Sequence, residues 1–336
     1  MDARLLSRVL SDPGYAGQLD DRGWTALLGM AHAERLTASL AYRLDGRTLP
    51  LQVQQIFTAA KLTAETGRTH ALWEAEMARR ALAPIGIKTV LLKGTAFVAT
   101  GLDAGRGRLI GDLDILVPRQ SLDAVEAAVL TAGWEWVKPD PYDDAYYRDF
   151  MHELPPLIHS ARDRMIDVHH TILPLTARIT PDAAALIADA ALLDNGLYVL
   201  SPPDMLIHGV AHLFADGDLQ GGLRNLWDID RLIREHSGAP DYWAKLLDRA
   251  RLHGLVSHTS RALRLTHHLF GTPVDPYLAY EPRRGDIFYT GRLLARNSWG
   301  QETRKILRLG FYIRSHWLRM PPLKLLKHLW TKWRRV

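Results

Sequence analysis

The chain has 336 residues, no cysteine, and 42 Lys and Arg side chains against 37 Asp and Glu side chains. Without cysteine it can form no disulfide framework, thiolate nucleophile or Cys-ligated zinc or iron–sulfur site, so a bound metal would need oxygen or imidazole ligands. The apolar fraction of 47% and charged fraction of 24% are typical of a soluble globular protein, and the length fits two domains or one decorated domain.

The positive charge is concentrated at the C-terminal end. Residues 301–336 contain ten basic side chains and one acid, Glu302, which makes this segment +9. Since the whole chain is +5, residues 1–300 sum to −4. A mildly acidic body argues against a long nucleic-acid groove, which would need a basic stripe through the catalytic domain.

The N-terminal segment and the hydropathy favour a cytoplasmic protein. Residues 1–17 lack the apolar region and the small-residue cleavage site of a secretory signal peptide. No stretch approaches the roughly 20 apolar residues of a membrane-spanning helix.

The predicted elements divide the chain into four parts. Helical spacing of apolar residues predicts an N-terminal helical region over residues 1–85, whose longest helix ends before Pro84 and Gly86. A mixed α/β core follows over residues 86–200, a second helical domain over 201–300, and a basic amphipathic tail over 301–336. Within the core we expect strands at 88–92, 112–117, 134–137 and 165–169, and a helix at 121–132.

Two carboxylates in the predicted strand DLDILV form the main candidate site. Side chains alternate along a strand, so Asp112 and Asp114 project from the same face, with Cα atoms about 6.5–7 Å apart. Two acids on one face repel unless a cation lies between them, and Mg²⁺ prefers oxygen ligands. A solvated pair on an edge strand is the plain alternative.

A third carboxylate, Asp167, lies in the predicted strand MIDVHH. On a neighbouring strand it would complete a site for two metal ions about 3.5–4 Å apart. His169 shares its strand face and could contact substrate or orient the carboxylate. The plain alternative for Asp167 is an ion pair with an arginine.

The segment LLKGTAF predicts a phosphate-binding turn before these strands. Gly94 and Thr95 follow a predicted strand at a helix start, where backbone N–H groups and the helix dipole favour anions. Lys93 could meet a phosphate as a point charge, and Arg106 or Arg108 in the next loop could do so with a planar guanidinium. An ordinary helix cap and solvated loop arginines are the alternatives.

Two further pairs on predicted helices are given structural roles. His208 and His212 lie four residues apart on one helix face, and we expect them to pack or form hydrogen bonds near the interface between domains. Asp228 and Asp230 diverge on a helix and cannot chelate together, so we expect capping or salt bridges, with Arg224 and Asp228 on a shared face.

The order of these motifs resembles the DNA polymerase beta-like nucleotidyltransferase superfamily. Its active site has a Gly-Ser turn, an Asp-x-Asp pair and a later single carboxylate. The segments KGTAF, RLIGDLDILV, HELPPL and IDVHH are more similar to a branch of uncharacterised bacterial nucleotidyltransferases, in which Lys-Gly replaces the usual lead-in and an arginine, here Arg108, precedes the first Asp by four residues. The resemblance covers roughly residues 20–300.

The resemblance implies an α+β fold, with a small mixed sheet flanked by N-terminal helices and a C-terminal helical domain. It implies that Asp112, Asp114 and Asp167 bind Mg²⁺ or Mn²⁺, and that Asp167 also assists deprotonation of the acceptor. Lys93, Gly94, Thr95 and Arg108 would hold the phosphates of a nucleoside triphosphate such as ATP, with Thr95 where serine is usual. It also places His152 and Glu153, which open the HELPPL segment, near the site.

The implied reaction is attack by an acceptor hydroxyl or phosphate on the α-phosphorus, with release of pyrophosphate. The acceptor would be a small molecule, a peptide or a glycan precursor. The alternatives are nucleotide transfer to RNA or to a protein hydroxyl, and a non-catalytic nucleotide- or partner-binding protein on the same scaffold. Metal-dependent hydrolysis is disfavoured because no histidine set has the spacing of metal ligands.

The tail alternates basic and apolar side chains on both sides of Pro321 and Pro322. Three interpretations remain: contact with an anionic membrane surface, which would place the protein at the inner membrane, contact with a polyanion such as nucleic acid, or docking on the protein body.

Overall fold

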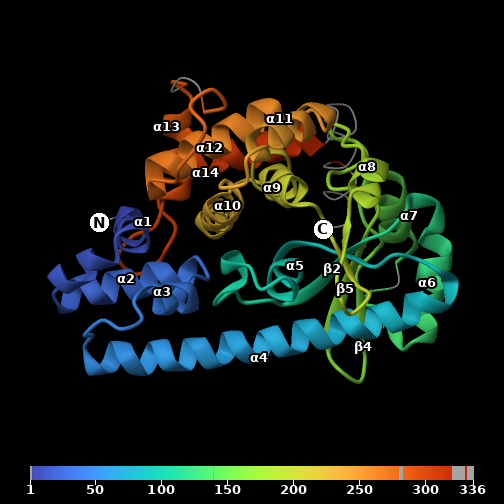
Figure 1. Cartoon of the computed structure of the whole chain (residues 1–336), viewed down its shortest axis with the longest axis horizontal. Coiled ribbons are helices and arrows are strands. Elements are labelled where there is room, and N and C mark those ends of the chain that lie inside the picture. Colours follow the sequence, from blue (N-terminus) through green and yellow to red (C-terminus); the bar gives the residue numbers. More distant parts are fainter. Residues whose placement is uncertain (1, 139, 280–282, 320–329, 331–336) are drawn as a thin grey trace.

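A computed structural model describes residues 2–138, 140–279, 283–319 and 330. Helices surround a mixed β-sheet, and the long helix α4 runs along one side of the molecule beneath the sheet and the N-terminal helices (Figure 1). The helices after residue 200 form the opposite side. The predicted α+β fold is therefore confirmed.

The sheet has seven strands in the order β3-β4-β5-β2-β1-β7-β6. Strand β2 is parallel to β5 and antiparallel to β1, which pairs in parallel with β7. The central strands carry Leu113, Ile115, Ile166 and Val168 into the core, all 2% exposed or less. The strands are β1 Val90–Leu91, β2 Asp112–Leu116, β3 Trp134–Trp136, β4 Leu157–His159, β5 Arg164–His169, β6 Ala191–Leu192 and β7 Tyr198–Val199.

Among the N-terminal helices, α4 packs against the sheet. Helix α4, with 32 residues, is about 48 Å long at 1.5 Å per residue and packs against α3, α5, α6 and β2. Glu74 on α4 is buried and receives two hydrogen bonds from Arg162, which joins the helix to the turn before β5. The helices of this region are α1 Arg4–Ser11, α2 Asp21–Ala33, α3 Thr37–Arg43 and α4 Leu51–Leu82.

The remaining helices cover the ends of the sheet and build the second half. Buried apolar side chains form one continuous cluster from Ala3 to Phe311, and α1 packs against α12. A buried ion pair between Glu34 and Arg296, 2.7 Å long, joins the two helical regions. These helices are α5 Lys93–Ala99, α6 Leu122–Thr131, α7 Pro141–Phe150, α8 Ala183–Ala188, α9 Pro202–Val210, α10 Gly222–His236, α11 Tyr242–Leu252, α12 Val256–Phe270, α13 Asp286–Leu293 and α14 Lys305–Arg319.

The first part of the predicted tail, α14, docks on the body. Phe311 and Ser315 are buried, and Arg314 donates a 2.6 Å hydrogen bond to the backbone oxygen of Phe214. The rest of the tail prediction, residues 320–329 and 331–336, lies outside the described residues. None of the helices in the described ranges is long and apolar enough to cross a membrane.

A tight contact fixes the loop between α5 and β2. The hydroxyl of Ser39 on α3 donates to the backbone oxygens of Arg106 and Gly107, at 3.0 and 3.3 Å. Gly107 has φ +69°, and a Cβ there would lie 2.5 Å from the backbone nitrogen of Ser39. Glycine is therefore required both by the left-handed conformation and by the close approach of two backbones.

Gly107→Ala should lower the free energy of unfolding by about 2–4 kcal/mol, because left-handed strain and overpacking add. Gly101→Ala is the matched control. Gly101 has φ +70° but open space around its Cβ position, so only the strain of about 1–2 kcal/mol applies. Urea unfolding of both variants measures the difference, and equal losses would show that the Ser39 contact contributes nothing.

Candidate active site

The parallel pairing of β2 with β5 brings three carboxylates together. Asp114 lies directly opposite Asp167 in the register, and Asp112 is two residues earlier on the same face of β2. Oxygen atoms of all three carboxylates lie within 4.8 Å of one another. The D-x-D spacing thus gives the convergence that strand alternation predicted, and the group has the chemistry and size of a divalent-cation site.

Asp114 is the buried centre of this group, with 3% of its surface exposed. Its Oδ1 accepts a 2.6 Å hydrogen bond from Lys93 Nζ and lies 2.9 Å from His169 Nε2. Burial alone would raise the pKa of Asp114, but the charge of Lys93 and the contact with His169 outweigh it and hold that pKa well below its usual range. Asp114 is therefore a permanent anion.

Lys93 reaches Asp114 from the first residue of α5. Its φ of +49° is left-handed, and β1 ends two residues earlier, so the chain turns sharply from strand to helix at this lysine. Burial would lower the pKa of Lys93, but attraction to Asp114, followed by that to Asp112 and Glu153, raises it above its ordinary value. The ammonium group is thus a fixed positive charge beside the carboxylates.

Asp167 has the opposite electrostatic setting from Asp114. Burial, followed by the negative charges of Glu153 and Asp114, raises the pKa of Asp167 to about 7. No described lysine or arginine forms an ion pair with it. The ion pair with arginine that the sequence left open is therefore not formed in the described part of the chain.

Glu153 is the fourth carboxylate of the site, and sequence reasoning gave it no role. A β-bridge pairs Glu153 with His169, and the Glu153 carboxylate lies 3.4 Å from His169 Nδ1. The ring of His152 lies 5.2 Å from that of His169, and ligand atoms of His152, Glu153 and His169 also converge within 4.8 Å. Burial, followed by the charges of His169 and Lys93, lowers the pKa of His152 well below its ordinary value, so this ring is neutral. The HELPPL segment, which the resemblance places near the site, was the sequence feature that could have indicated Glu153.

Arg108 lies across the start of α5. A Cβ at Gly94 would meet Arg108 Nε at 2.5 Å, so only glycine leaves room for the guanidinium at this helix end. Arg108 forms an ion pair with Asp228 of α10, and Asp228 also pairs with Arg224 at 2.7 Å. The salt bridging expected of Asp228 is confirmed, and Asp230 likewise pairs with Arg231 and with Arg234.

A cavity of about 40 Å³ lies between these charges and α9. Lys93, Arg108, His208, His212 and Asp228 are among the residues that line it. His208 is buried, and its pKa is well below the ordinary value, first because of burial and then because of the charge of Lys93. The space holds a few water molecules at most and is too small for a ligand the size of a nucleotide.

A family model described as "Uncharacterised nucleotidyltransferase" matches residues 20–271, three quarters of the chain. The chain belongs to this nucleotidyltransferase family. No curated protein matches the chain. The match includes the turn at Lys93, both aspartate strands and the HELPPL segment, and membership of the family gives nucleotidyl transfer as the general reaction type and a nucleoside triphosphate as substrate.

Two residues predicted to hold phosphate have other surroundings in this nucleotidyltransferase. Arg106 is exposed and stacks on the ring of Tyr42, with 4.7 Å between guanidinium and ring centre. Thr95 is 1% exposed, and its hydroxyl has no hydrogen-bond partner among the described residues. Lys93 and His169 contact Asp114, His152 lies beside His169, and Arg108 lies beside Gly94 at the start of α5. Neither Thr95 nor Arg106 contacts the three carboxylates within the described ranges.

In the metal-free nucleotidyltransferase, the free energy of unfolding should depend on pH through the titration of Asp167. Between pH 4 and 7 the unfolded carboxyl loses its proton while the folded one keeps it, so this group destabilises the fold increasingly as pH rises and fully above pH 7. Asp167→Asn should therefore gain about 1–3 kcal/mol relative to the wild type between pH 4 and pH 8, at about 1.4 kcal/mol per pKa unit and with partial solvation.

Urea unfolding in EDTA at several pH values measures this gain, with exposed Asp123→Asn on α6 as the control. A difference between Asp167→Asn and the wild type that stays constant from pH 4 to pH 8 would show that the pKa of Asp167 is not raised.

Proposed function

We propose that this protein transfers a nucleoside monophosphate from a nucleoside triphosphate to a hydroxyl or phosphate of an acceptor, in a reaction that depends on Mg²⁺ or Mn²⁺. The observation that supports this is the convergence of Asp112, Asp114 and Asp167 within 4.8 Å in a chain of the nucleotidyltransferase family. We infer that the site is of the kind found in the DNA polymerase beta-like superfamily.

The residues present fit a divalent cation. All three candidate ligands are carboxylates, which Mg²⁺ and Mn²⁺ prefer, and no described cation pairs with Asp112 or Asp167. Burial first, and then the nearby charges of Glu153 and Asp114, raise the pKa of Asp167, so a cation there would offset negative charge that no described ion pair offsets. When bound, a divalent ion held by Asp112, Asp114 and Asp167 would neutralise the negative charge that builds up on the departing pyrophosphate.

The protein's own groups supply positioning and charge. Lys93 is fixed on Asp114, and Arg108 lies over the glycine at the start of α5, so both can meet phosphate oxygens. To bind a phosphate, Arg108 must either share its guanidinium between the phosphate and Asp228 or break its ion pair with Asp228. The acceptor oxygen forms a bond to the α-phosphorus, the bond to pyrophosphate breaks, and Asp167 takes the acceptor proton on a carboxylate oxygen.

His169 and His152 act as positioning residues in this proposal. The ring of His169 lies between two acidic residues: its Nε2 contacts Asp114 and its Nδ1 approaches Glu153. The ring can therefore hold Asp114 in one orientation. The net charge of −4 over residues 1–300 favours a small molecule, a peptide or a glycan precursor as acceptor over a long nucleic acid.

The test combines each labelled nucleoside triphosphate, Mg²⁺ or Mn²⁺ and cell extract with the full-length protein. We expect one labelled product and metal-dependent pyrophosphate release. Asp112→Asn with Asp114→Asn should lower the rate at least about 10³-fold, because the cation loses two of its three carboxylate ligands. Asp123→Asn is the matched control and should keep the wild-type rate. Unchanged pyrophosphate release in the double variant, or no labelled product with any nucleotide, would contradict the proposal and favour the non-catalytic scaffold.

We also propose that the C-terminal segment contacts an anionic membrane surface. Ile306, Leu309 and Ile313 on α14 are 90%, 57% and 58% exposed, although the opposite face of the helix is docked. Lys305 and Arg308 are also exposed on this helix, and no acidic residue lies within it. An exposed apolar stripe among cations is typical of helices that bind at the lipid interface.

Flotation of the full chain with liposomes tests this contact. Ile306→Asp with Ile313→Asp should weaken binding to anionic liposomes at least about tenfold, since about 1.5–3 kcal/mol of apolar burial is lost. Leu51→Asp with Leu62→Asp is the control, because both side chains are similarly exposed on α4, at 65% and 70%. Equal flotation of the two double variants would remove the membrane contact.

A further inference from the structure

A second and much larger cavity, of about 910 Å³, lies between α1, α12 and α13. None of its lining residues belongs to the carboxylate group or to the small cavity beside Lys93. Helices α9 and α10 separate α12 from α5, so this cavity is on the far side of these helices from the candidate active site (Figure 1). Its volume is within the range of about 300–1,000 Å³ that small-molecule sites occupy.

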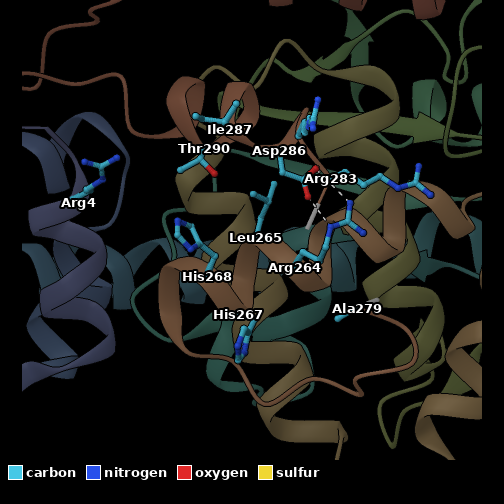
Figure 2. Close-up of a pocket in the computed structure, with 11 residues that line it drawn as sticks. Arg4, Arg264, Leu265, His267, His268, Ala279, Arg283, Asp286, Ile287 and Thr290 are labelled. Carbon is cyan, nitrogen blue, oxygen red and sulfur yellow. Dashed lines mark hydrogen bonds and ion pairs between the residues drawn. The ribbon is translucent and has the colours of Figure 1, made fainter. Parts of the chain in front are cut away.

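Arginine dominates the lining of this cavity. Arg4 approaches it from α1, Arg264 from α12, and Arg283 and Arg284 from the residues just before α13 (Figure 2). Asp286 is the acidic residue among the described lining. The cavity therefore concentrates positive charge within a body whose net charge is negative.

The charge of Asp286 is already used inside the protein. Its carboxylate accepts hydrogen bonds from Arg264, at 2.6 and 3.3 Å, and from Arg261 at 3.1 Å. Burial would raise the pKa of Asp286, but the two arginines hold that pKa below its usual value. The carboxylate therefore stays ionised, and its charge is balanced by Arg261 and Arg264. Arg283 and Arg284 are exposed and form no ion pair with a described residue, which leaves both guanidinium groups for a ligand.

Apolar side chains lie between the charged groups. Figure 2 shows Leu265 and Thr290 between Arg4 on one side and the Arg264–Asp286 pair on the other, with Ile287 beside Thr290. Leu265 and Thr290 are buried, whereas Ile287 is 71% exposed at the edge of the cavity. A bare anion would contact the arginines and leave the exposed side chain of Ile287 in water.

We propose that the cavity binds a phosphorylated amphiphile, a molecule with a phosphate group joined to an apolar chain. Guanidinium groups match phosphate oxygens with paired hydrogen bonds, and several together suit a group with more than one negative charge. The apolar chain would cover the exposed side chain of Ile287. A soluble phosphorylated metabolite and a phospholipid headgroup share this chemistry.

Calorimetric titration of the full chain, in EDTA, with hexyl phosphate and separately with inorganic phosphate tests the site. Hexyl phosphate should bind more tightly than inorganic phosphate. Arg283→Ala with Arg284→Ala should weaken it more than about tenfold, as charge-assisted hydrogen bonds are lost. Arg22→Ala with Arg47→Ala removes the same charge from two other exposed positions without a described ion pair, and should bind like the wild type.

Two further variants separate the parts of the proposal. Ile287→Asn, at an exposed position, removes apolar surface without adding charge and should weaken hexyl phosphate but not inorganic phosphate. Asp112→Asn with Asp114→Asn should leave hexyl phosphate binding unchanged, which distinguishes this cavity from the active site. Vesicles containing phosphatidate identify the source: if they displace hexyl phosphate, the ligand is a lipid headgroup, and if they do not, it is a soluble phosphorylated molecule.

Three results would overturn the proposal. These are no binding of hexyl phosphate, equal affinity for inorganic phosphate, or equal affinity in the Arg283→Ala, Arg284→Ala variant and its control. Urea unfolding of the Arg283→Ala, Arg284→Ala variant, its arginine control and the Ile287 variant should match the wild type, because these substituted side chains are exposed.

Discussion

Mutual repulsion of three carboxylates is the constraint around which the site is organised. The register of β2 and β5 places Asp112, Asp114 and Asp167 within 4.8 Å, and their charges must be offset for the sheet to form. The structure does this differently at each position. Asp114, which is buried, is paired with Lys93 and His169, whereas Asp112 is solvated and Asp167 holds its proton up to a pKa of about 7. A divalent cation would replace the proton at Asp167 as the offsetting charge.

The backbone around the site follows from that requirement. Parallel pairing of β2 with β5 needs a long connection, and the segment with α6, α7 and the β3–β4 hairpin supplies it. Lys93 reaches Asp114 only because the chain turns at a left-handed lysine directly after β1. The second cation, Arg108, is balanced by Asp228, itself shared with Arg224, so a buried network of opposite charges extends from the sheet into α10. Such networks stabilise little by themselves but are costly to break, which fixes the geometry of the site.

The sequence predicts best the elements in which apolar and polar side chains follow a clear local period. Strands β2 and β5 and helix α6 lie within a residue or two of their expected bounds, because DLDILV and MIDVH alternate clearly between faces. The predicted strand at 88–92 shortens to Val90–Leu91, since Leu92 already caps α5. Strands β4, β6 and β7 have two or three residues each, too few to show a period. Glu153 and the Arg108–Asp228 pair depend on contacts between distant segments, which a single sequence cannot locate. The same holds for the arginine-lined cavity, whose walls come from α1, α12 and α13.

The distribution of charge connects the two cavities. Residues 1–300 sum to −4, so a phosphate-binding place among them needs its own local positive field. Lys93 and Arg108 provide it at the carboxylates, in a volume too small for more than water behind them. Arg4, Arg264, Arg283 and Arg284 provide it in the larger cavity, where apolar walls add a second requirement. Helix α9 packs against both α5 and α12, and α10 packs against α12, so these two helices lie between the two cavities. In our proposals the two places differ in what they select, since the first would take the reacting phosphates and the second an anion with an apolar chain.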